Sequence, residues 1–259
     1  DGPKAYLLDA FITYNRFSFA KVSMGSFKSP FGLELNTPCH SLHTINRSKV
    51  VNSLTAPDRD MGLMLLGGSD TTLLRYAIAI MNGTGLLAHD QDTYKDVVGR
   101  IMIQPTDWMH VGGSFKMGKS VNEDPSLDDN TTMRFGAEFE ANYANFLVQG
   151  EYIYGEDDGS YLVGGGCGSD PELVIGNVKR SGMFVTVLYN TPWNIQPVIK
   201  YENFNSDIDI ADNMEQITTF GVNYFFNEWT RLQVNYEYAA EQAREIKNDR
   251  LMVQLQVRF

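Results

Sequence analysis

Apolar and polar residues alternate with a period of two over the C-terminal part of the chain. Between Leu251 and Phe259 every odd position is apolar, and three of the four even positions are polar. The same alternation runs through residues 219–226 and 231–238. Successive side chains of a strand point to opposite faces, so the pattern predicts strands with one apolar face and one wet face.

These predicted strands are long. Each alternating run continues for about ten residues, whereas strands of globular proteins most often have about 5–6. A strand of about ten residues that is tilted by about 45° can cross the core of a bilayer. The last run also ends on an aromatic residue, as bacterial outer-membrane barrels commonly do. The pattern therefore predicts an all-β fold, an antiparallel transmembrane β-barrel.

Strand candidates follow the whole chain, and short and long connections alternate strictly between them. The expected strands, about thirteen in number, lie near residues 6–14, 17–28, 61–65, 74–80, 97–103, 109–117, 133–141, 146–154, 183–189, 193–204, 219–226, 231–238 and 251–259. Outer-membrane barrels have short periplasmic turns and long outer loops, whereas soluble sandwiches have no reason to alternate in this way. Residues 156–177 are expected to be a long, glycine-rich loop. We interpret residues 1–259 as a single barrel domain.

Aromatic residues stand beside the predicted short turns and at the end of the last strand. Amphipathic aromatic rings concentrate at the interfaces between a membrane and water, whereas tryptophans of a soluble core would fall in the middle of strands. We therefore predict an aromatic girdle that consists of Trp108, Tyr143, Trp193, Phe226, Trp229 and Phe259.

The charge of the chain is strongly negative. It has 32 acidic and 21 basic residues and a net charge of −11, which argues against nucleic acid as a partner. The acids gather in the long loops, which fits either solvated loops or divalent cations that bridge lipopolysaccharide. A mean hydropathy of −0.26 suits a barrel, because half of each strand faces water. No apolar run reaches the about 18 residues of a transmembrane helix.

Several stretches of the sequence resemble the phosphate-selective porin O and P family. They are Leu8-Asp-Ala-Phe-Ile12, the run Gly-Ser-Phe-Lys-Ser-Pro-Phe-Gly-Leu-Glu at 25–34, Asn-Arg-Ser at 46–48, Pro-Asp-Arg-Asp-Met-Gly at 57–62, Thr-Phe-Gly-Val-Asn-Tyr at 219–224 with Asn-Glu at 227–228, and Gln-Val-Asn-Tyr at 233–236. The resemblance covers nearly the whole chain. It implies a homotrimeric porin of sixteen strands whose third loop folds into the lumen, where basic side chains line a path for anions.

By position, residues 30–56 match the inward-folded constriction loop of that family, and Arg47 matches a basic residue near the constriction. In sixteen-stranded porins this loop follows the fifth strand, whereas here it follows the second. Single-chain bacterial barrels also carry even numbers of strands. We therefore expect three further strands, about 80–100 residues, before Asp1 in the intact protein.

The polar face of each predicted strand gives the residues expected to face the lumen. Together with Arg59, the basic ones are Lys21, Arg75, Arg100, Lys116, Arg134, Lys200, Arg231 and Arg258, and the acidic ones are Glu138, Glu140, Glu151, Glu202 and Glu237. Four of the basic residues, from Arg75 to Arg134, fall on consecutive strands and would form a positive stripe. Two interpretations stay open: the charges pair with one another, or the stripe and Arg47 attract anions.

Few residues suggest other chemistry. Cys39, His40 and His43 have a spacing that suits metal binding, but without a second cluster we expect no metal and no cofactor. A disulfide between Cys39 and Cys167 is possible in an oxidising compartment, since both would lie at one end of the barrel. No Ser/His/Asp grouping lies at neighbouring outward positions, as a hydrolase site would require.

The sequence thus predicts a porin of the bacterial outer membrane, with its C-terminus on the periplasmic side and lipid and lipopolysaccharide around it. It would allow passive diffusion of small hydrophilic solutes, with a preference for anions such as phosphate and no chemical step. The alternatives are a barrel hydrolase and a structural or surface-binding barrel that is closed by its loops.

Overall fold

The computed structural model describes residues 7–69, 71–86, 88, 92–122, 128–163, 172–242 and 246–258, without the side chains of 160–163 and 172–174. It contains one antiparallel sheet of thirteen strands. In chain order these are β1 (Ala10–Phe17), β2 (Ala20–Lys28), β3 (Arg59–Gly67), β4 (Leu74–Met81), β5 (Asp96–Thr106), β6 (Met109–Ser120), β7 (Asn130–Tyr143), β8 (Phe146–Val163), β9 (Glu172–Tyr189), β10 (Ile195–Asn205), β11 (Met214–Phe225), β12 (Thr230–Glu241) and β13 (Arg250–Val257).

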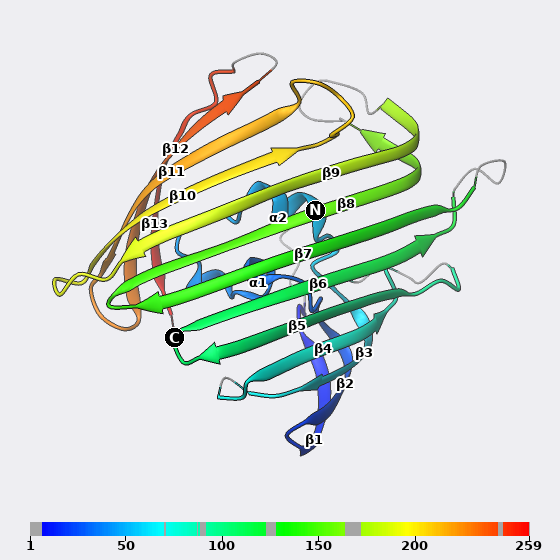
Figure 1. Ribbon diagram of the computed structural model, residues 1–259, viewed down its shortest axis with the longest axis horizontal. Helices are drawn as coiled ribbons and strands as arrows, with labels where there is room; N and C mark the ends of the chain where they lie inside the picture. Colours follow the sequence, from blue (N-terminus) through cyan, green and yellow to red (C-terminus); the bar gives the residue numbers. More distant parts are fainter. Residues whose placement is uncertain are drawn as a thin grey trace.

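Every strand pairs with the next strand in the sequence, so the sheet is a simple meander (Figure 1). Connections of two to six residues alternate with connections of eight to thirty residues. All short turns therefore lie at one end of the sheet and all long connections at the other. The predicted fold class, the strand number and the alternation of connections are confirmed.

The hairpin of β8 and β9 is longer than the sequence suggested. The two strands have 18 residues each, and their pairing continues to Val163 and Glu172. The prediction of a loop over residues 156–177 was therefore wrong for most of that stretch. Glycines interrupt the apolar alternation there without ending the strands, since Gly159 and Gly176 face each other in the sheet with φ of +137° and +133°.

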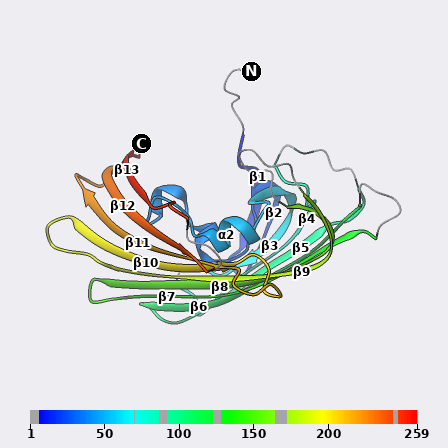
Figure 2. The ribbon, with the colours of Figure 1, turned by 90° about the horizontal axis from the view of Figure 1, so that it is seen from above.

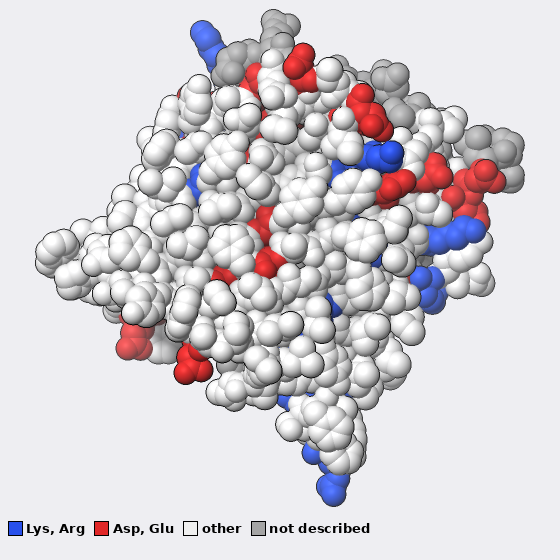
Figure 3. All heavy atoms as spheres, in the orientation of Figure 1, with Lys and Arg blue, Asp and Glu red and all other residues white. Residues whose placement is uncertain are grey.

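The two faces of the sheet differ as the alternation predicts. Val222, Val234 and Val253 are neighbours across three strands on the convex face, where Val222 and Val253 are exposed. On β12, the middle one of these strands, Gln233 and Asn235 point to the concave face and are fully buried. Figure 3 shows the convex face with few charged side chains, which gather mainly along the edge that carries the long connections. Among the described residues no helix has the length and apolar character to cross a membrane.

Aromatic side chains surround the short turns. Trp108, Tyr143, Trp193, Phe226 and Trp229 are all exposed. Two of them, Trp108 and Tyr143, are ring neighbours with centroids 5.6 Å apart. Phe259, the sixth residue of the predicted girdle, lies outside the described residues.

Residues 29–58, which connect β2 to β3 and are called the inner segment below, lie on the concave face. The segment contains two short helices, α1 (Leu33–Asn36) and α2 (Lys49–Leu54), and a 3₁₀ turn, η1 (Cys39–Ser41). Figure 2 shows the sheet curved into a trough with these helices inside it. The packed core of the molecule lies between the inner segment and the sheet.

Candidate functional site

Apolar side chains attach the inner segment to the sheet. Phe31, Leu35, Val50, Val51 and Leu54 of the segment are nearly inaccessible to solvent. They pack in one cluster with side chains of the strands, namely Phe27, Ala79, Met81, Val98, Ile153, Phe184 and Phe204. Burial of a large apolar side chain contributes about 1.5–3 kcal/mol relative to exposure. The helices of the segment are therefore fixed, although each is too short to be stable alone.

Glu151 of β8 fixes the first turn of α1. Its Oε2 atom accepts hydrogen bonds from the backbone N–H groups of Leu33 (3.2 Å) and Glu34 (3.0 Å). One residue earlier, the N–H of Gly32 donates to the Ser114 hydroxyl of β6 at 2.9 Å. The first N–H groups of a helix lack partners within the helix, so these acceptors satisfy groups that would otherwise be buried without hydrogen bonds.

Four amide side chains hold the middle of the inner segment over β10, β11 and β12. Gln233 donates to Asn223 (3.1 Å), Asn223 to Gln196 (2.8 Å) and Gln196 to Asn190 (2.8 Å). We call this set the amide relay: Asn190, Gln196, Asn223 and Gln233. From it, Asn223 also donates to the carbonyl of His43 at 2.9 Å.

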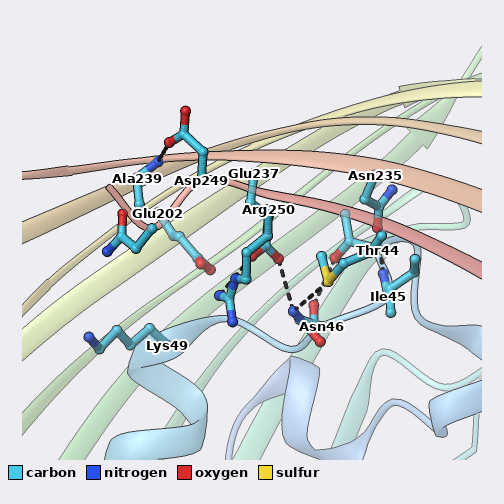
Figure 4. A network of polar contacts seen from close by, with 12 residues as sticks. Thr44, Ile45, Asn46, Lys49, Glu202, Asn235, Glu237, Ala239, Asp249 and Arg250 are labelled. Atoms are coloured by element: carbon cyan, nitrogen blue, oxygen red, sulfur yellow. Dashed lines mark hydrogen bonds and ion pairs between the residues drawn. The ribbon is translucent and has the colours of Figure 1, made fainter. Parts of the chain in front are cut away.

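The next residues of the segment continue along β12 (Figure 4). The N–H of Ile45 donates to Asn235 Oδ1 at 2.7 Å, and the amide of Asn46 donates to Glu237 Oε1 at 3.0 Å. The inward side chains of β12 at positions 233, 235 and 237 therefore contact successive residues of the segment. Neutral groups provide most of these contacts.

Several predicted lumen cations bind backbone carbonyls of the inner segment. Lys200 donates to Asn46 O (3.1 Å), Arg134 to Leu54 O (3.1 Å) and Lys116 to Ala56 O (3.0 Å). Lys28 at the end of β2 donates to Leu35 O at 2.7 Å. These cations therefore position the segment in addition to facing the concave side.

The predicted positive stripe has its own carboxylates. Ion pairs join Arg100 to Glu138 with an Nε–Oε2 distance of 3.0 Å, Lys116 to Asp96 at 3.2 Å and Arg134 to Asp157 at 2.7 Å. Lys200 pairs in the same way with Glu202 at 3.3 Å. Neighbouring carboxylates therefore compensate most of the positive charge of the stripe.

Arg47 is placed differently from the stripe. Its guanidinium donates to the carbonyls of Glu34 (3.1 Å), Leu35 (3.4 Å) and Thr37 (2.6 Å), which closes the C-terminal end of α1. It also approaches the sulfur of Cys39 at 3.7 Å. No carboxylate of the described residues forms an ion pair with it. Arg47 is half-buried, and its positive charge is not part of an ion pair with a described carboxylate.

Two cavities open on opposite sides of the place where the inner segment crosses β12. The long-loop cavity, of about 570 Å³, is lined by residues that include Asn46, Arg47, Lys49, Glu202, Glu237 and Arg250. The short-turn cavity, of about 300 Å³, is lined by residues that include His43, Phe225, Glu228, Trp229, Arg231 and Arg258. Along β12, Arg231 lies in one cavity, Glu237 in the other, and the contacts of Gln233 and Asn235 to the segment lie between them.

The other predicted site residues lie away from this crossing. Lys21 is partly buried opposite Leu66 of β3. Arg59, at the long-connection end of β3, forms an ion pair with Asp9 at 3.0 Å. Arg75 shares the concave side of β4 with Ala77, which faces Arg100 in β5.

The cysteine and histidine residues of the inner segment form no cluster. Cys39 is an exposed free thiol, and its predicted disulfide partner, Cys167, lies outside the described residues. Within the described ranges no three His, Cys, Asp or Glu side chains come together in a way that could hold a metal ion. His43 lies in the short-turn cavity, where burial and the nearby charge of Arg231 lower its pKa from 6.5 to about 4.

Sequence reasoning missed the apolar patch on the concave face and the amide relay. Inward positions were expected to be polar, but Phe184, Ile153 and Val98 share that face with Glu151 and Lys116. Their positions in the sequence could have indicated this, because each occupies a position of the polar face in a strand that otherwise alternates. The amides of Asn223 and Gln233 were counted only as wet-face residues, and their partners depend on the register.

The whole chain matches one family model, and its fold matches solved porins. The family model, phosphate-selective porin O and P, covers residues 1–259. The trimer form of OmpT from Vibrio cholerae, folded in vitro, has a TM-score of 0.66 at 13% identity, with 99% of this chain and 82% of that chain covered. The anion-selective porin from Comamonas acidovorans has a TM-score of 0.60 at 8% identity, with 93% and 70% covered.

Salmonella typhi OmpF in complex with daunomycin has a TM-score of 0.58 at 16% identity, with 93% of this chain and 74% of that chain covered. At these identities the solved structures show the fold alone, and no curated protein sequence matches significantly. The family match carries the assignment. This chain belongs to the phosphate-selective porin O and P family and is an outer-membrane porin.

Proposed function

We propose that the porin lets small hydrophilic solutes diffuse passively between the long-loop cavity and the short-turn cavity, past the inner segment. The observation that supports this path is the crossing itself, where Gln233 and Asn235 bind the segment between the two cavities. The segment would act as the constriction, because it occupies the concave side without covering all of it. No chemical step is part of this function.

The proposed charge preference is a weak preference for anions. The ion pairs of Arg100, Lys116 and Arg134 favour local compensation over a positive stripe. Arg47 and Arg231 have no carboxylate partner among the described ion pairs, and each lines one of the two cavities. These two cations would attract anions such as phosphate, since fixed positive side-chain charges along a pore lower the barrier to anion entry.

The proposed assembly is a homotrimer with its short turns toward the periplasm. Short turns on the periplasmic side and long loops outside are usual for barrels of this class. The exposed aromatic residues beside the short turns support an interface with the membrane at that end. Lipid would cover the convex face, and lipopolysaccharide would surround the long loops.

Recordings in planar lipid bilayers test the channel. An open-channel conductance is expected for the purified protein. Turnover of ester or phospholipid substrates without any conductance would instead favour a barrel hydrolase, and the absence of both would favour a closed structural barrel.

The role of Arg47 has its own test, the reversal potential in a salt gradient. Arg47→Gln should shift it toward cation selectivity and increase current noise, because three carbonyls at the end of α1 lose their donor. Arg47→Lys should keep most of the selectivity, since the charge remains. Lys179→Gln, an equal loss of charge at a partly exposed position of β9, is the control. If Arg47→Gln changed neither quantity, the proposed role would be wrong.

A further inference from the structure

The short-turn cavity contains a buried cation whose hydrogen-bonding capacity is mostly unused. Only 7% of Arg231 is exposed. Its Nε atom donates to Gln256 Oε1 at 2.6 Å, and no hydrogen bond joins either terminal nitrogen to any described residue. An unpaired charged group is costly to bury. A site that buries this guanidinium beside an open cavity is therefore suited to an acceptor that the described residues do not provide.

The charges around the cavity indicate the charge of that acceptor. Arg231 and Arg258 are cationic, and Glu228 is anionic. His43 is neutral at pH 7, because its pKa is about 4. Among the described charged side chains of the cavity, two cations and one anion leave one positive unit, which a monoanion would neutralise. Inorganic phosphate is a mixture of monoanion and dianion near neutral pH, and its dianion would leave excess negative charge in this cavity.

The walls of the cavity indicate the rest of the ligand. Phe225 lies opposite Arg231 in the sheet, on the same face. Trp229 lies at the short turn, and the Arg258 guanidinium stands 5.9 Å from the centre of its ring. Aromatic walls favour an apolar or aromatic body. A volume of about 300 Å³ is at the small end of the range for ligand sites.

We propose that the short-turn cavity binds small organic monocarboxylates with an apolar or aromatic body. The planar guanidinium of Arg231 would bind the carboxylate through its terminal nitrogens, a geometry that matches both groups. Phe225 and Trp229 would contact the body. This inference rests on the proposed channel function and assigns to it a class of solute that the cavity retains during passage.

Benzoate is the probe, and its block of chloride current through the channel in planar bilayers is the measurement. Micromolar to millimolar benzoate should reduce the current in a saturable manner. Arg231→Gln should weaken the block about tenfold or more, as loss of a hydrogen-bonded ion pair does. Arg231→Lys should give an intermediate block, because the charge remains but the two terminal nitrogens of the guanidinium are lost. In Lys179→Gln, the matched control, benzoate should block the current as strongly as in the native protein.

Two further probes define the class of ligand. Benzyl alcohol, which has a similar body without the carboxylate, should not block, and inorganic phosphate should block more weakly than benzoate. Equal block by benzoate and benzyl alcohol would overturn the role of the carboxylate. Equal or stronger block by phosphate would overturn the monocarboxylate class, and an unchanged block in Arg231→Gln would overturn the site.

Tryptophan fluorescence separates this inference from the channel function. In a Trp108→Phe/Trp193→Phe variant, Trp229 is the only tryptophan left among residues 1–259. Benzoate should change its emission in a saturable manner, whether or not current flows. A chloride current without any benzoate effect on Trp229 would overturn the inference and leave the porin function intact, whereas binding without current would contradict the channel function alone.

Discussion

Gly32 shows at the scale of one residue how the inner segment leaves the barrel wall. Its φ of +66° lies in the left-handed region that favours glycine. A Cβ atom at this position would overlap a carboxylate oxygen of Glu151. The turn therefore requires both the conformation and the small size of glycine, and the carboxylate that fixes α1 fills the space that a side chain would need.

Gly32→Ala should therefore destabilise the folded barrel by about 1–3 kcal/mol, the usual cost of a strained backbone position. The measurement is the denaturant midpoint of the protein in lipid vesicles. Gly113→Ala is the control, because a Cβ atom there meets only an ordinary contact, 3.6 Å from Gly136 O. Equal midpoints for the two variants would contradict the account of this turn.

His43 predicts a dependence of stability on pH. Its folded pKa of about 4 is below the unfolded value of 6.5, so the unfolded chain binds more protons between these values. The stability that comes from the neutral ring is complete above about pH 6.5 and falls as the pH drops toward 4, by up to about 3 kcal/mol. His43→Gln should remove this part of the pH dependence in denaturant titrations. If the pH profile of stability were the same in His43→Gln and in the native protein, the proposed contribution of His43 would be wrong.

Residue-scale pairing could be predicted only in part from the sequence. The concave position of Arg134 follows from the alternation of β7. Its pairing with Asp157 does not, because the partner depends on the register of β8, and that register depends on a hairpin whose extent the glycines obscured. The family resemblance predicted that Arg47 lies near the constriction. Its three carbonyl partners could not be predicted, because they depend on how the inner segment folds.

At the scale of elements, the inner segment is held by packing and by amides more than by charge. Val50, Val51 and Leu54 of α2 contact the apolar patch on the sheet, and the amide relay holds the stretch before that helix. Sequence patterns identified the segment by its length and position. They could not show where it docks, because the parity of Phe184 and Phe204 indicates only that both lie on the inner face and not which part of the segment they contact.

Asn235→Leu should loosen the segment at its crossing over β12. Asn235 is fully buried and accepts the Ile45 N–H at 2.7 Å, so the substitution leaves that donor without a partner. The expected cost is about 1–3 kcal/mol, with more frequent current fluctuations in single-channel records. Gln254→Leu is the control, because Gln254 lies on the neighbouring strand β13 and is exposed. Equal noise in the two variants would argue against the crossing as a fixed point.

At the scale of the whole molecule, the fold was largely predictable. Period-two alternation, the alternation of short and long connections and the aromatic residues beside short turns are properties of long sequence stretches, so one irregular residue does not change them. Thirteen strands were expected and are present. Side-chain contacts across the trough could not be predicted, because they join residues up to 206 positions apart.

The convex face provides a test of the membrane-spanning arrangement. Val222→Arg should cost about 2–4 kcal/mol in lipid vesicles, as arginine does on the lipid face near the centre of a bilayer. Ile210→Arg, an exposed position in the connection between β10 and β11, should cost almost nothing. Free energies of folding into vesicles measure both. Similar values for the two variants would contradict the assignment of this face to lipid.

The amide relay has a consequence for how the channel responds to changes in salt concentration. Hydrogen bonds between uncharged amides do not weaken when dissolved ions accumulate, whereas exposed ion pairs do. The aperture beside β11 and β12 should therefore keep its width from low to high salt, while any selectivity by charge decreases with rising ionic strength.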